Sequence, residues 1–514
     1  MRRATMQSVV RSELAAVANG SHRSTMMSLP PDPAQLLNLS LARQGIEYAG
    51  NGARLRWVMQ RLRAGRHVSV AAVGGSVSAG RNYEVVRGAA GTALYHSLVA
   101  TVLRQSAMRL SNRPPDGVSH HNGALPATGP SFFEHCIGAA VPNSSHLVLL
   151  EFALNTLSNF RAFERMLLRI LMRRPRPPAV IVVNVHAWTL VSRTSGRRQR
   201  GVCFNQPTPR QIARGMKGRR NTPLGAHIVT ADWLASPAVR ADQSWRSTQL
   251  FDDEDAIARV CRHYGVPLVS MRAALLGAVR DGSIRLSSFT GDCKHPNEQG
   301  HLYLAQLVLE RLLASVEDGR EGDVTPSLPE SSFEWTRRES CAVSAALPQL
   351  VLRSSGFNYT DEGRGKPGLV ATQAGASVTL CVASKGSGGS AVFVGYLESY
   401  EGMGRAAVSC ANRCECGSGQ VLDAHAPAQR VSVTAVRPVQ VVMRRGDASA
   451  SRVGKSCCEL TLRVLPTSAS GGSKFKVMSL ITPPRAGLVA NNVVVDQHAA
   501  SSSGRDCPSC VFPG

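Results

Sequence analysis

A serine on a glycine-rich turn and a distant histidine are the residues best suited to chemistry in this chain. The serine lies in Gly74-Gly75-Ser76-Val77-Ser78-Ala79-Gly80, after an apolar run, and the histidine lies in Asp292-Cys293-Lys294-His295. A serine hydroxyl is a weak nucleophile and needs a base to accept its proton. Histidine suits this task because its pKa lies close to neutrality, and a carboxylate can fix its tautomer. Ser76, His295 and Asp292 together predict a serine hydrolase.

Each segment also has a simpler interpretation. The glycine-rich turn could be an ordinary strand-to-helix turn or a phosphate-binding loop, although a Walker loop would end in Gly-Lys-Ser/Thr and no lysine is present. It differs from the Gly-x-Ser-x-Gly elbow of α/β-hydrolases because position 78 is serine. The segment from Asp292 to His295 could be a surface turn. Catalysis is favoured because the two segments complement each other.

Acyl transfer also needs hydrogen-bond donors for the oxyanion that develops in the transition state. Asn155 lies just after the apolar run 146–152, so its side-chain amide can reach a site at the end of a strand. Gly123, in the run 122–129, could supply a backbone N–H. The simpler alternatives are a helix-capping asparagine and a plain turn glycine.

Short apolar runs alternate with helical patterns between residues 46 and 315, and this alternation predicts a parallel sheet covered on both faces. Residues 1–45 are expected to be irregular. The segment 187–225 is rich in arginine and predicts a long surface insertion. It could be a solvated, mobile loop, a lid, or a contact for an anionic ligand. The predicted strands are 67–73, 146–152, 179–185 and 266–271, and the predicted helices are 82–104, 161–172, 252–264 and 298–313.

The pattern changes after a linker at 316–340 that is rich in Gly, Pro, Ser and acidic residues. Short β-like runs separated by Gly and Ser clusters then predict a smaller all-β, sandwich-like domain over 341–484. Residues 485–514 are predicted to be a disordered tail. The predicted strands of this domain are 376–382, 391–397, 430–433, 440–443 and 459–464.

Composition restricts the classes of protein that fit. The chain of 514 residues has 43% hydrophobic residues, 5% aromatic residues and a formal net charge of +24, carried mostly by arginine. A basic surface can bind nucleic acid, an anionic polysaccharide or an anionic membrane, and the simpler alternative is arginine spread over a solvated surface. The simpler alternative is favoured because aromatic residues are few and no nucleic-acid-binding motif is present, so no nucleic-acid partner is expected. Nine of the 13 cysteines follow residue 340. This clustering predicts disulfides in an oxidising compartment, and the odd number leaves at least one thiol unpaired.

Four segments together resemble the SGNH (GDSL-like) hydrolase superfamily. The serine, glycine, asparagine and histidine blocks of that family correspond, in order, to 74–80, 122–129, 151–155 and 292–295. The resemblance implies a flavodoxin-like three-layer α/β/α sandwich, with Ser76 as nucleophile, His295 as base and Asp292 as its orienting acid. It also implies that Gly123 and Asn155 join the Ser76 N–H as oxyanion donors. One departure from the family pattern is the threonine at 156, where many members have aspartate. Within the glycine block, Gly129 is the alternative to Gly123.

The second domain resembles the β-rich C-terminal region of SGNH proteins from plants, algae and related eukaryotes. The resemblance rests on three segments, 366–368, 396–404 and 474–476. Tyr396 and Tyr400 could stack on sugar rings, although aromatic residues in strands more often pack in the core.

The resulting hypothesis is a serine esterase that hydrolyses an O-acyl ester on a carbohydrate or a lipid through an acyl-enzyme. A carbohydrate O-acyltransferase and a non-catalytic glycan-binding protein are the alternatives. No metal or organic cofactor is expected, and no stretch is apolar enough to predict a membrane-spanning helix. The cysteines favour the secretory pathway or an extracellular location, and an organelle lumen is the alternative.

Overall fold

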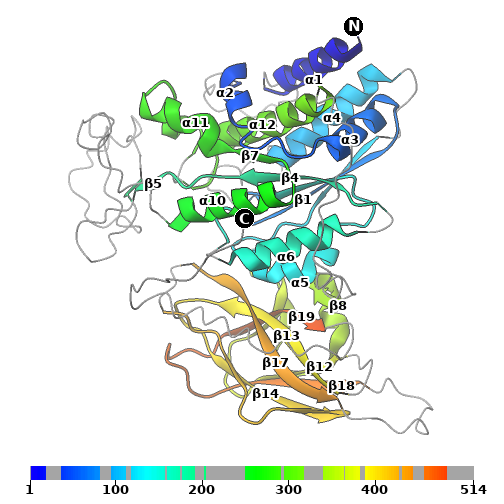
Figure 1. Ribbon diagram of the computed structural model, residues 1–514. Coiled ribbons are helices and arrows are strands. Elements are labelled where there is room, and N and C mark those ends of the chain that lie inside the picture. The colour runs from blue at the N-terminus through cyan, green and yellow to red at the C-terminus, as the bar shows by residue number, and fades with distance from the viewer. Residues whose placement is uncertain are drawn as a thin grey trace, which may run out of the picture.

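The protein has two parts, an α/β domain and a β-rich domain (Figure 1). The computed structural model describes residues 2–18, 36–80, 94–111, 117–156, 159–173, 176–190, 202–203, 249–290, 294–317, 340–363, 365–382, 388–427, 431–443 and 457–482. The predicted tail at 485–514 and nearly all of the arginine-rich insertion lie outside these residues.

A five-stranded parallel sheet forms the centre of the α/β domain, in the order β2-β1-β3-β4-β7. Flavodoxin-like doubly wound domains have the same order, and their ligands bind at the carboxyl ends of the strands. Ser76 and Asn155 follow two such ends, those of β1 and β3. The strands are β1 (Val68–Gly74), β2 (Val118–Asn122), β3 (Leu147–Glu151), β4 (Ala179–Asn184) and β7 (Leu268–Ser270).

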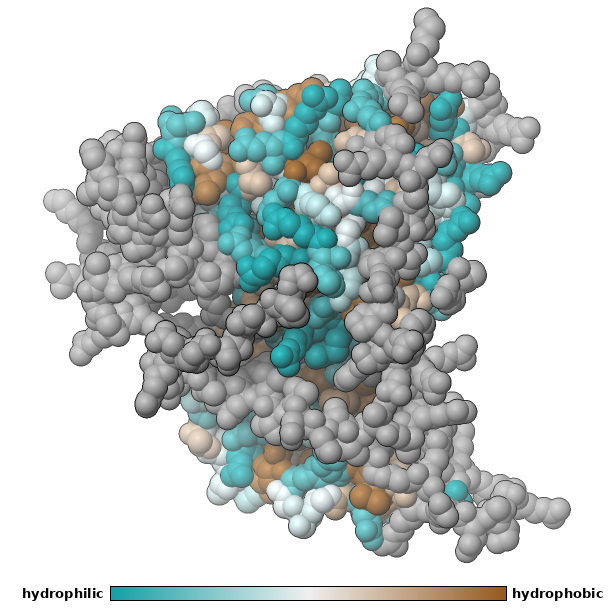
Figure 2. Space-filling model, in the orientation of Figure 1, coloured by the Kyte–Doolittle hydropathy of each residue, from teal (hydrophilic) through white to brown (hydrophobic). Residues whose placement is uncertain are grey.

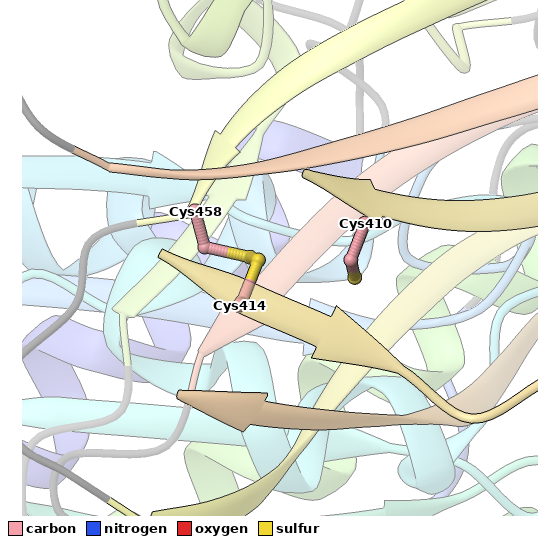
Figure 3. A group of neighbouring side chains, drawn as sticks. All are labelled: Cys410, Cys414 and Cys458. Carbon is pink, nitrogen blue, oxygen red and sulfur yellow. A yellow bond between two sulfur atoms is a disulfide. The ribbon is translucent and has the colours of Figure 1, made fainter. Parts of the chain in front are cut away.

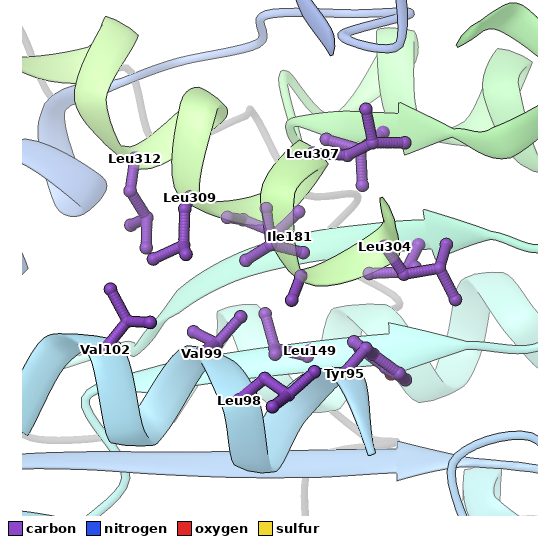
Figure 4. Close-up of a cluster of buried hydrophobic side chains, with 14 of the residues drawn as sticks. Tyr95, Leu98, Val99, Val102, Leu149, Ile181, Leu304, Leu307, Leu309 and Leu312 are labelled. Carbon is purple, nitrogen blue, oxygen red and sulfur yellow. The ribbon is translucent and has the colours of Figure 1, made fainter. Parts of the chain in front are cut away.

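Helices cover both faces of this sheet because its strands are apolar on both sides. Val70, Leu149 and Ile181 face one core, while Ala71, Val148 and Val182 face the other. Figure 4 shows side chains of α4 and α12 meeting over the first face. The helices of that side are α3 (Ala53–Arg63), α4 (Tyr95–Leu110), α11 (Met271–Arg280) and α12 (Glu298–Glu317), and those of the other are α5 (Pro130–Ala140), α6 (Phe160–Leu171) and α10 (Gln249–His263).

The layered α/β architecture agrees with the prediction from the alternating runs. All four predicted strands of the sheet are present, as are the helices predicted at 161–172, 252–264 and 298–313. Of the helix predicted at 82–104, the described part begins at Tyr95. The strand β2 and the helices α3, α5 and α11 were not predicted.

The expectation of irregular structure before residue 45 is wrong for two segments, α1 (Arg2–Ala18) and α2 (Leu39–Gln44). Met6, Val10, Leu14 and Ala18 recur every four residues and are all buried in the first core. Arg11 of α1 also forms an ion pair with Glu310 of α12. Helix α1 therefore packs as a part of the α/β domain.

The β-rich domain is a sandwich of two antiparallel sheets, ordered β10-β11-β19-β13-β17-β15, with β8 beside β19, and β16-β14-β18-β12-β9. Their inner faces share one apolar core, which includes Val394 and Leu380. The strands are β8 (Ser340–Val343), β9 (Val351–Ser355), β10 (Asn358–Thr360), β11 (Gly368–Ala371), β12 (Ser377–Val382), β13 (Gly388–Glu398), β14 (Arg405–Asn412), β15 (Cys414–Cys416), β16 (Val421–Asp423), β17 (Val433–Met443), β18 (Cys458–Val464) and β19 (Phe475–Thr482).

Three boundaries differ from the predictions. The segments 430–433 and 440–443 were predicted as separate strands, but one strand, β17, runs from Val433 to Met443 because both halves pair with β13. Helix α12 continues to Glu317, and β8 begins at Ser340, so the predicted linker is shorter at both ends.

Two short paired strands, β5 (Thr189–Leu190) and β6 (Val202–Cys203), lie in the arginine-rich segment.

Helices α5 and α6 lie between the parallel sheet and the β-rich domain (Figure 1). The core on that side of the sheet includes Phe133 of α5 and Ile481 of β19, with Phe393 of β13 and Val436 of β17 packed against it. A disulfide between Cys136 and Cys341 joins α5 to β8. The two domains therefore share an apolar core and a covalent link.

Among the residues that the structure describes, three further disulfides lie within the β-rich domain, as the cysteine clustering predicts: Cys381–Cys457, Cys410–Cys416 and Cys414–Cys458. The sulfur atoms of Cys410, Cys414 and Cys458 lie within 4.8 Å of one another (Figure 3). All three are oxidised in disulfides, so they offer no thiolate to a metal ion. Cys261 is a free, buried thiol.

On the face shown in Figure 2, hydrophilic side chains cover much of the α/β domain, and apolar ones form small groups. Among the described residues, no helix is long and apolar enough to cross a membrane.

Candidate active site

Ser76 and His295 meet at the carboxyl edge of the parallel sheet. Ser76 follows the end of β1, in a turn closed by a hydrogen bond from Ala79 N–H to Gly75 O. Its Oγ lies 2.8 Å from Nε2 of His295, although 219 residues separate the two in the chain. A neutral imidazole with its proton on Nδ1 accepts the serine proton in this geometry. The residues predicted as nucleophile and base therefore lie within hydrogen-bond distance of each other.

The loop that carries His295 is held on both sides. The hydroxyl of Thr290 donates to His295 O at 2.8 Å, and Asn297 N–H donates to Phe289 O at 3.0 Å. The Asn297 side chain then accepts from Gly300 N–H, which caps the start of α12. The histidine is thereby fixed between a closed loop and a long helix. Asp292, the predicted orienting acid, lies outside the described residues.

Asn155 lies beside the turn 75–79, which carries Ser76 and is called the nucleophile turn below, as predicted. A Cβ atom on Gly75 would collide with the Asn155 side chain, so glycine is required for this close approach. The Oδ1 atom of Asn155 is buried and accepts no hydrogen bond from the part of the chain that the structure describes. Thr156 supports the turn by donating to Phe152 O at 2.8 Å. The threonine thus supplies local support to the turn that carries Asn155.

Gly123 does not fit its predicted role as an oxyanion donor. Its N–H donates to Ala72 O at 2.9 Å, which continues the pairing of β2 with β1. Its Cα also packs against Ala140 O, closely enough to exclude any side chain. Gly123 therefore extends the sheet. Gly129, the rival glycine, packs against the backbone oxygen of Asn155.

A buried carboxyl beneath the nucleophile turn was not predicted as a functional residue. Glu151, the last residue of β3, has no exposed surface. Its Oε2 accepts from Ser78 N–H at 3.3 Å and from Ser78 Oγ at 3.2 Å, and its backbone oxygen accepts from Gly75 N–H. Burial raises the pKa of Glu151 to about 8, so it is protonated at neutral pH. An acidic residue ending an apolar strand was the sequence signal for this site.

Ser78 anchors the turn from below. Besides Glu151, its hydroxyl contacts the Tyr95 hydroxyl at 3.0 Å, and its backbone oxygen accepts from His96 Nε2 at 2.8 Å. Tyr95 N–H in turn donates to His301 Nδ1. Burial lowers the pKa of both His96 and His301 to about 3, so both imidazoles are neutral. A network of neutral groups thus supports the nucleophile turn, which explains a serine at position 78.

The Glu151→Gln variant should be stabilised relative to the parent as pH rises. Between about pH 4.5 and 8, the folded state keeps a proton on Glu151 that the unfolded state has lost. Rising pH therefore lowers the free energy of unfolding of the parent. The glutamine variant has no such proton, so this contribution is absent from its free energy of unfolding. The expected gain grows by up to about 1.4 kcal/mol per pH unit in this window. Urea unfolding at several pH values measures it, with the exposed Glu401→Gln as control. A gain independent of pH would contradict the assignment.

The two tyrosines proposed for sugar stacking differ in exposure. Tyr396 is 2% exposed, stacks on Phe475 and donates to Glu398 and Asp423 O, so it is a core residue. Tyr400 is 47% exposed, and its backbone oxygen accepts from His425 Nε2. Only Tyr400 of this pair can meet a ligand.

Solved structures share this two-domain fold. A two-domain esterase active on acetylated mannans matches with a TM-score of 0.54 and 18% identity, over 86% of this chain and 98% of that chain. The same kind of esterase, co-crystallized with mannopentaose, matches with a TM-score of 0.54 and 18% identity, over 87% and 99%. No protein-family model and no curated protein matches the chain. At this identity, the likeness shows the fold.

Proposed function

We propose that the protein is a serine esterase of the SGNH type that removes O-acyl groups from a carbohydrate. The observation that carries the proposal is the 2.8 Å hydrogen bond between Ser76 Oγ and His295 Nε2 at the carboxyl edge of the sheet. The shared fold with an esterase active on acetylated mannans supports it. That likeness also favours an acylated carbohydrate over an acyl lipid as the substrate class.

The reaction proceeds through an acyl-enzyme. Ser76 Oγ attacks the ester carbonyl carbon while His295 Nε2 takes the serine proton. The protonated His295 then delivers this proton to the departing sugar oxygen, and the acyl group stays on Ser76. A water molecule, deprotonated by His295, next attacks the acyl carbon. The bond between this carbon and Ser76 Oγ breaks, His295 returns the proton to Oγ, and the carboxylic acid is released. Asp292 is proposed to orient His295 and to stabilise its charged form.

The negative charge on the carbonyl oxygen is stabilised by donors next to Ser76. The Asn155 amide is one such donor, because its side chain lies over Gly75. The backbone N–H of Ser76 is the second. The proposed reaction needs no metal or organic cofactor, because the nucleophile, the base and both oxyanion donors belong to this chain.

A secreted protein fits the proposed substrate. Four disulfides are present among the described residues, and disulfides persist in oxidising compartments. Acylated cell-wall or storage glycans would be met in the same surroundings.

A fluorophosphonate probe and an ester panel test the proposal. The folded protein should be labelled once, on the peptide that contains Ser76, and should release acetate from acetylated mannan faster than fatty acid from an acyl lipid. Absence of labelling in protein with an intact circular dichroism spectrum would refute the serine mechanism. Faster cleavage of the lipid would refute the carbohydrate assignment while leaving the mechanism standing.

A further inference from the structure

A loop next to the nucleophile, Ala124–Gly129, is enclosed by three parts of the molecule. On one side, Leu125 N–H donates to Gly74 O at 3.1 Å, directly before the nucleophile turn. On a second side, Gly129 packs against the backbone oxygen of Asn155. The third neighbour is the β-rich domain. The loop therefore links the surroundings of the nucleophile to the second domain.

The backbone of this loop is strained at Ala127. Its φ of 47° lies in the left-handed region, which residues with a Cβ rarely adopt. Such conformations persist where the surroundings impose them, and they cluster at active sites. We therefore expect contacts of the loop 124–129 to hold Ala127 in its left-handed conformation.

Thr434, near the start of β17, supplies two of these contacts. Its N–H donates to Ala127 O at 3.3 Å, and its Oγ1 lies 2.8 Å from Thr128 Oγ1. The Thr128 hydroxyl also donates to Pro126 O at 3.2 Å, and either hydroxyl of the Thr128–Thr434 pair can be its donor. Thr128 is fully buried, which strengthens the effect of this hydrogen bond.

The position of Thr434 is itself fixed. It pairs with Leu397 of β13 inside an eleven-residue ladder, and the neighbouring Ser432 hydroxyl bonds to Ser399 at 2.8 Å. The disulfide between Cys136 and Cys341 ties the helix that follows the loop to the same domain. The β-rich domain is thus a rigid support for the loop.

We infer that Thr434 is a positioning residue of the active site, through which the β-rich domain holds the loop 124–129 against the nucleophile turn and Asn155. This inference rests on the proposed esterase function. It assigns the second domain a part in the reaction that is separate from any binding of glycan. Because the loop borders the nucleophile turn, its displacement should lower kcat more than it raises KM.

The test uses the full chain and 4-nitrophenyl acetate, a substrate too small to need a glycan subsite. Thr434→Val should lower kcat by about three- to tenfold with KM unchanged, the size expected for one lost hydrogen bond. Thr434→Ser, which keeps the hydroxyl, should restore it. The matched control is Thr379→Val, because Thr379 and Thr461 form a similar hydroxyl pair at 2.9 Å within the β-rich domain.

A double variant tests the strain directly. Glycine adopts the left-handed conformation without a Cβ, so Ala127→Gly should restore part of the activity lost in Thr434→Val. This outcome is expected only if Thr434 acts by holding the strained loop. It also keeps the test decisive if Thr434→Val is poorly folded, since Thr434→Ser and the double variant then give the comparison.

Two results would overturn the inference. One is a kcat for Thr434→Val equal to that of the parent. The other is an equal loss in Thr379→Val, which would indicate a general weakening of the domain. The Ser76→Ala variant distinguishes failure of the esterase proposal from failure of the positioning role of Thr434. If it loses activity while Thr434→Val keeps it, only this inference fails, whereas full activity of Ser76→Ala would remove the esterase proposal and this inference with it.

Discussion

Replacing Ser76 with alanine should lower kcat/KM for small aryl esters by about 10⁴-fold or more, the loss seen when a catalytic nucleophile is removed from a triad. The alanine removes the protein atom that bonds to the acyl carbon in the proposed mechanism. The His295 contact at 2.8 Å is lost with it. Steady-state kinetics with 4-nitrophenyl acetate measures the effect, and the rate of fluorophosphonate labelling should fall in parallel.

Ser409→Ala is a suitable control for this experiment. Ser409 is an exposed serine on β14 of the β-rich domain and should keep the full activity. A parent-like rate in Ser76→Ala would indicate hydrolysis by another group or by a contaminant. A similar loss in both variants would point to instability instead of catalysis.

Removing the Cys136–Cys341 disulfide between the domains should lower the free energy of unfolding more than any other substitution predicted here. Cys136 and Cys341 are 205 residues apart, so the cross-link strongly restricts the unfolded chain. The Cys136→Ala/Cys341→Ala variant should lose about 2–5 kcal/mol of the free energy of unfolding. Urea unfolding followed by circular dichroism measures this loss, and kinetics at low temperature shows whether the folded variant keeps its activity.

The Cys410–Cys416 disulfide offers a comparison with the same chemistry, because its cysteines are only six residues apart. Chain entropy predicts that its removal costs about 3 kcal/mol less than removal of the Cys136–Cys341 bond. Equal losses in the two alanine pairs would show that native contacts, and not the restriction of the unfolded chain, determine the stabilisation.

The pairing of Ser76 with His295 could be predicted from the sequence because a candidate nucleophile and base are recognised by residue type and local spacing. A serine among glycines after an apolar run, and a histidine before a helix, are local patterns. The strands that position them are fully buried and therefore read as unbroken apolar runs. The same reasoning placed Asn155 at the end of β3.

The assignment of Gly123 failed because strand β2 was not recognised. Its sequence, Val-Ser-His-His-Asn, is polar, and β2 is an edge strand of the sheet with most of its residues partly or fully exposed. Without that strand, Gly123 was interpreted as a loop glycine whose N–H was available. In the structure this N–H belongs to the ladder with β1.

Glu151 and Thr434 escaped prediction for a different reason. The importance of Glu151 comes from its complete burial beneath the nucleophile turn, and burial of one carboxyl is a tertiary property. Thr434 contacts a loop that lies 306 residues earlier in the chain. No local pattern carries this information, since the contact depends on how one domain packs on the other.

The position of α5 and α6 between the sheet and the sandwich has a consequence for molecular motion. Two domains joined by a flexible linker commonly close on a ligand by rotating about a hinge. Here such a rotation would expose Phe133 and Ile481 to water and would strain the covalent bond between α5 and β8. The two halves should therefore tumble as a single body, with or without a glycan, and adaptation to different substrates falls to the loops at the carboxyl edge of the sheet.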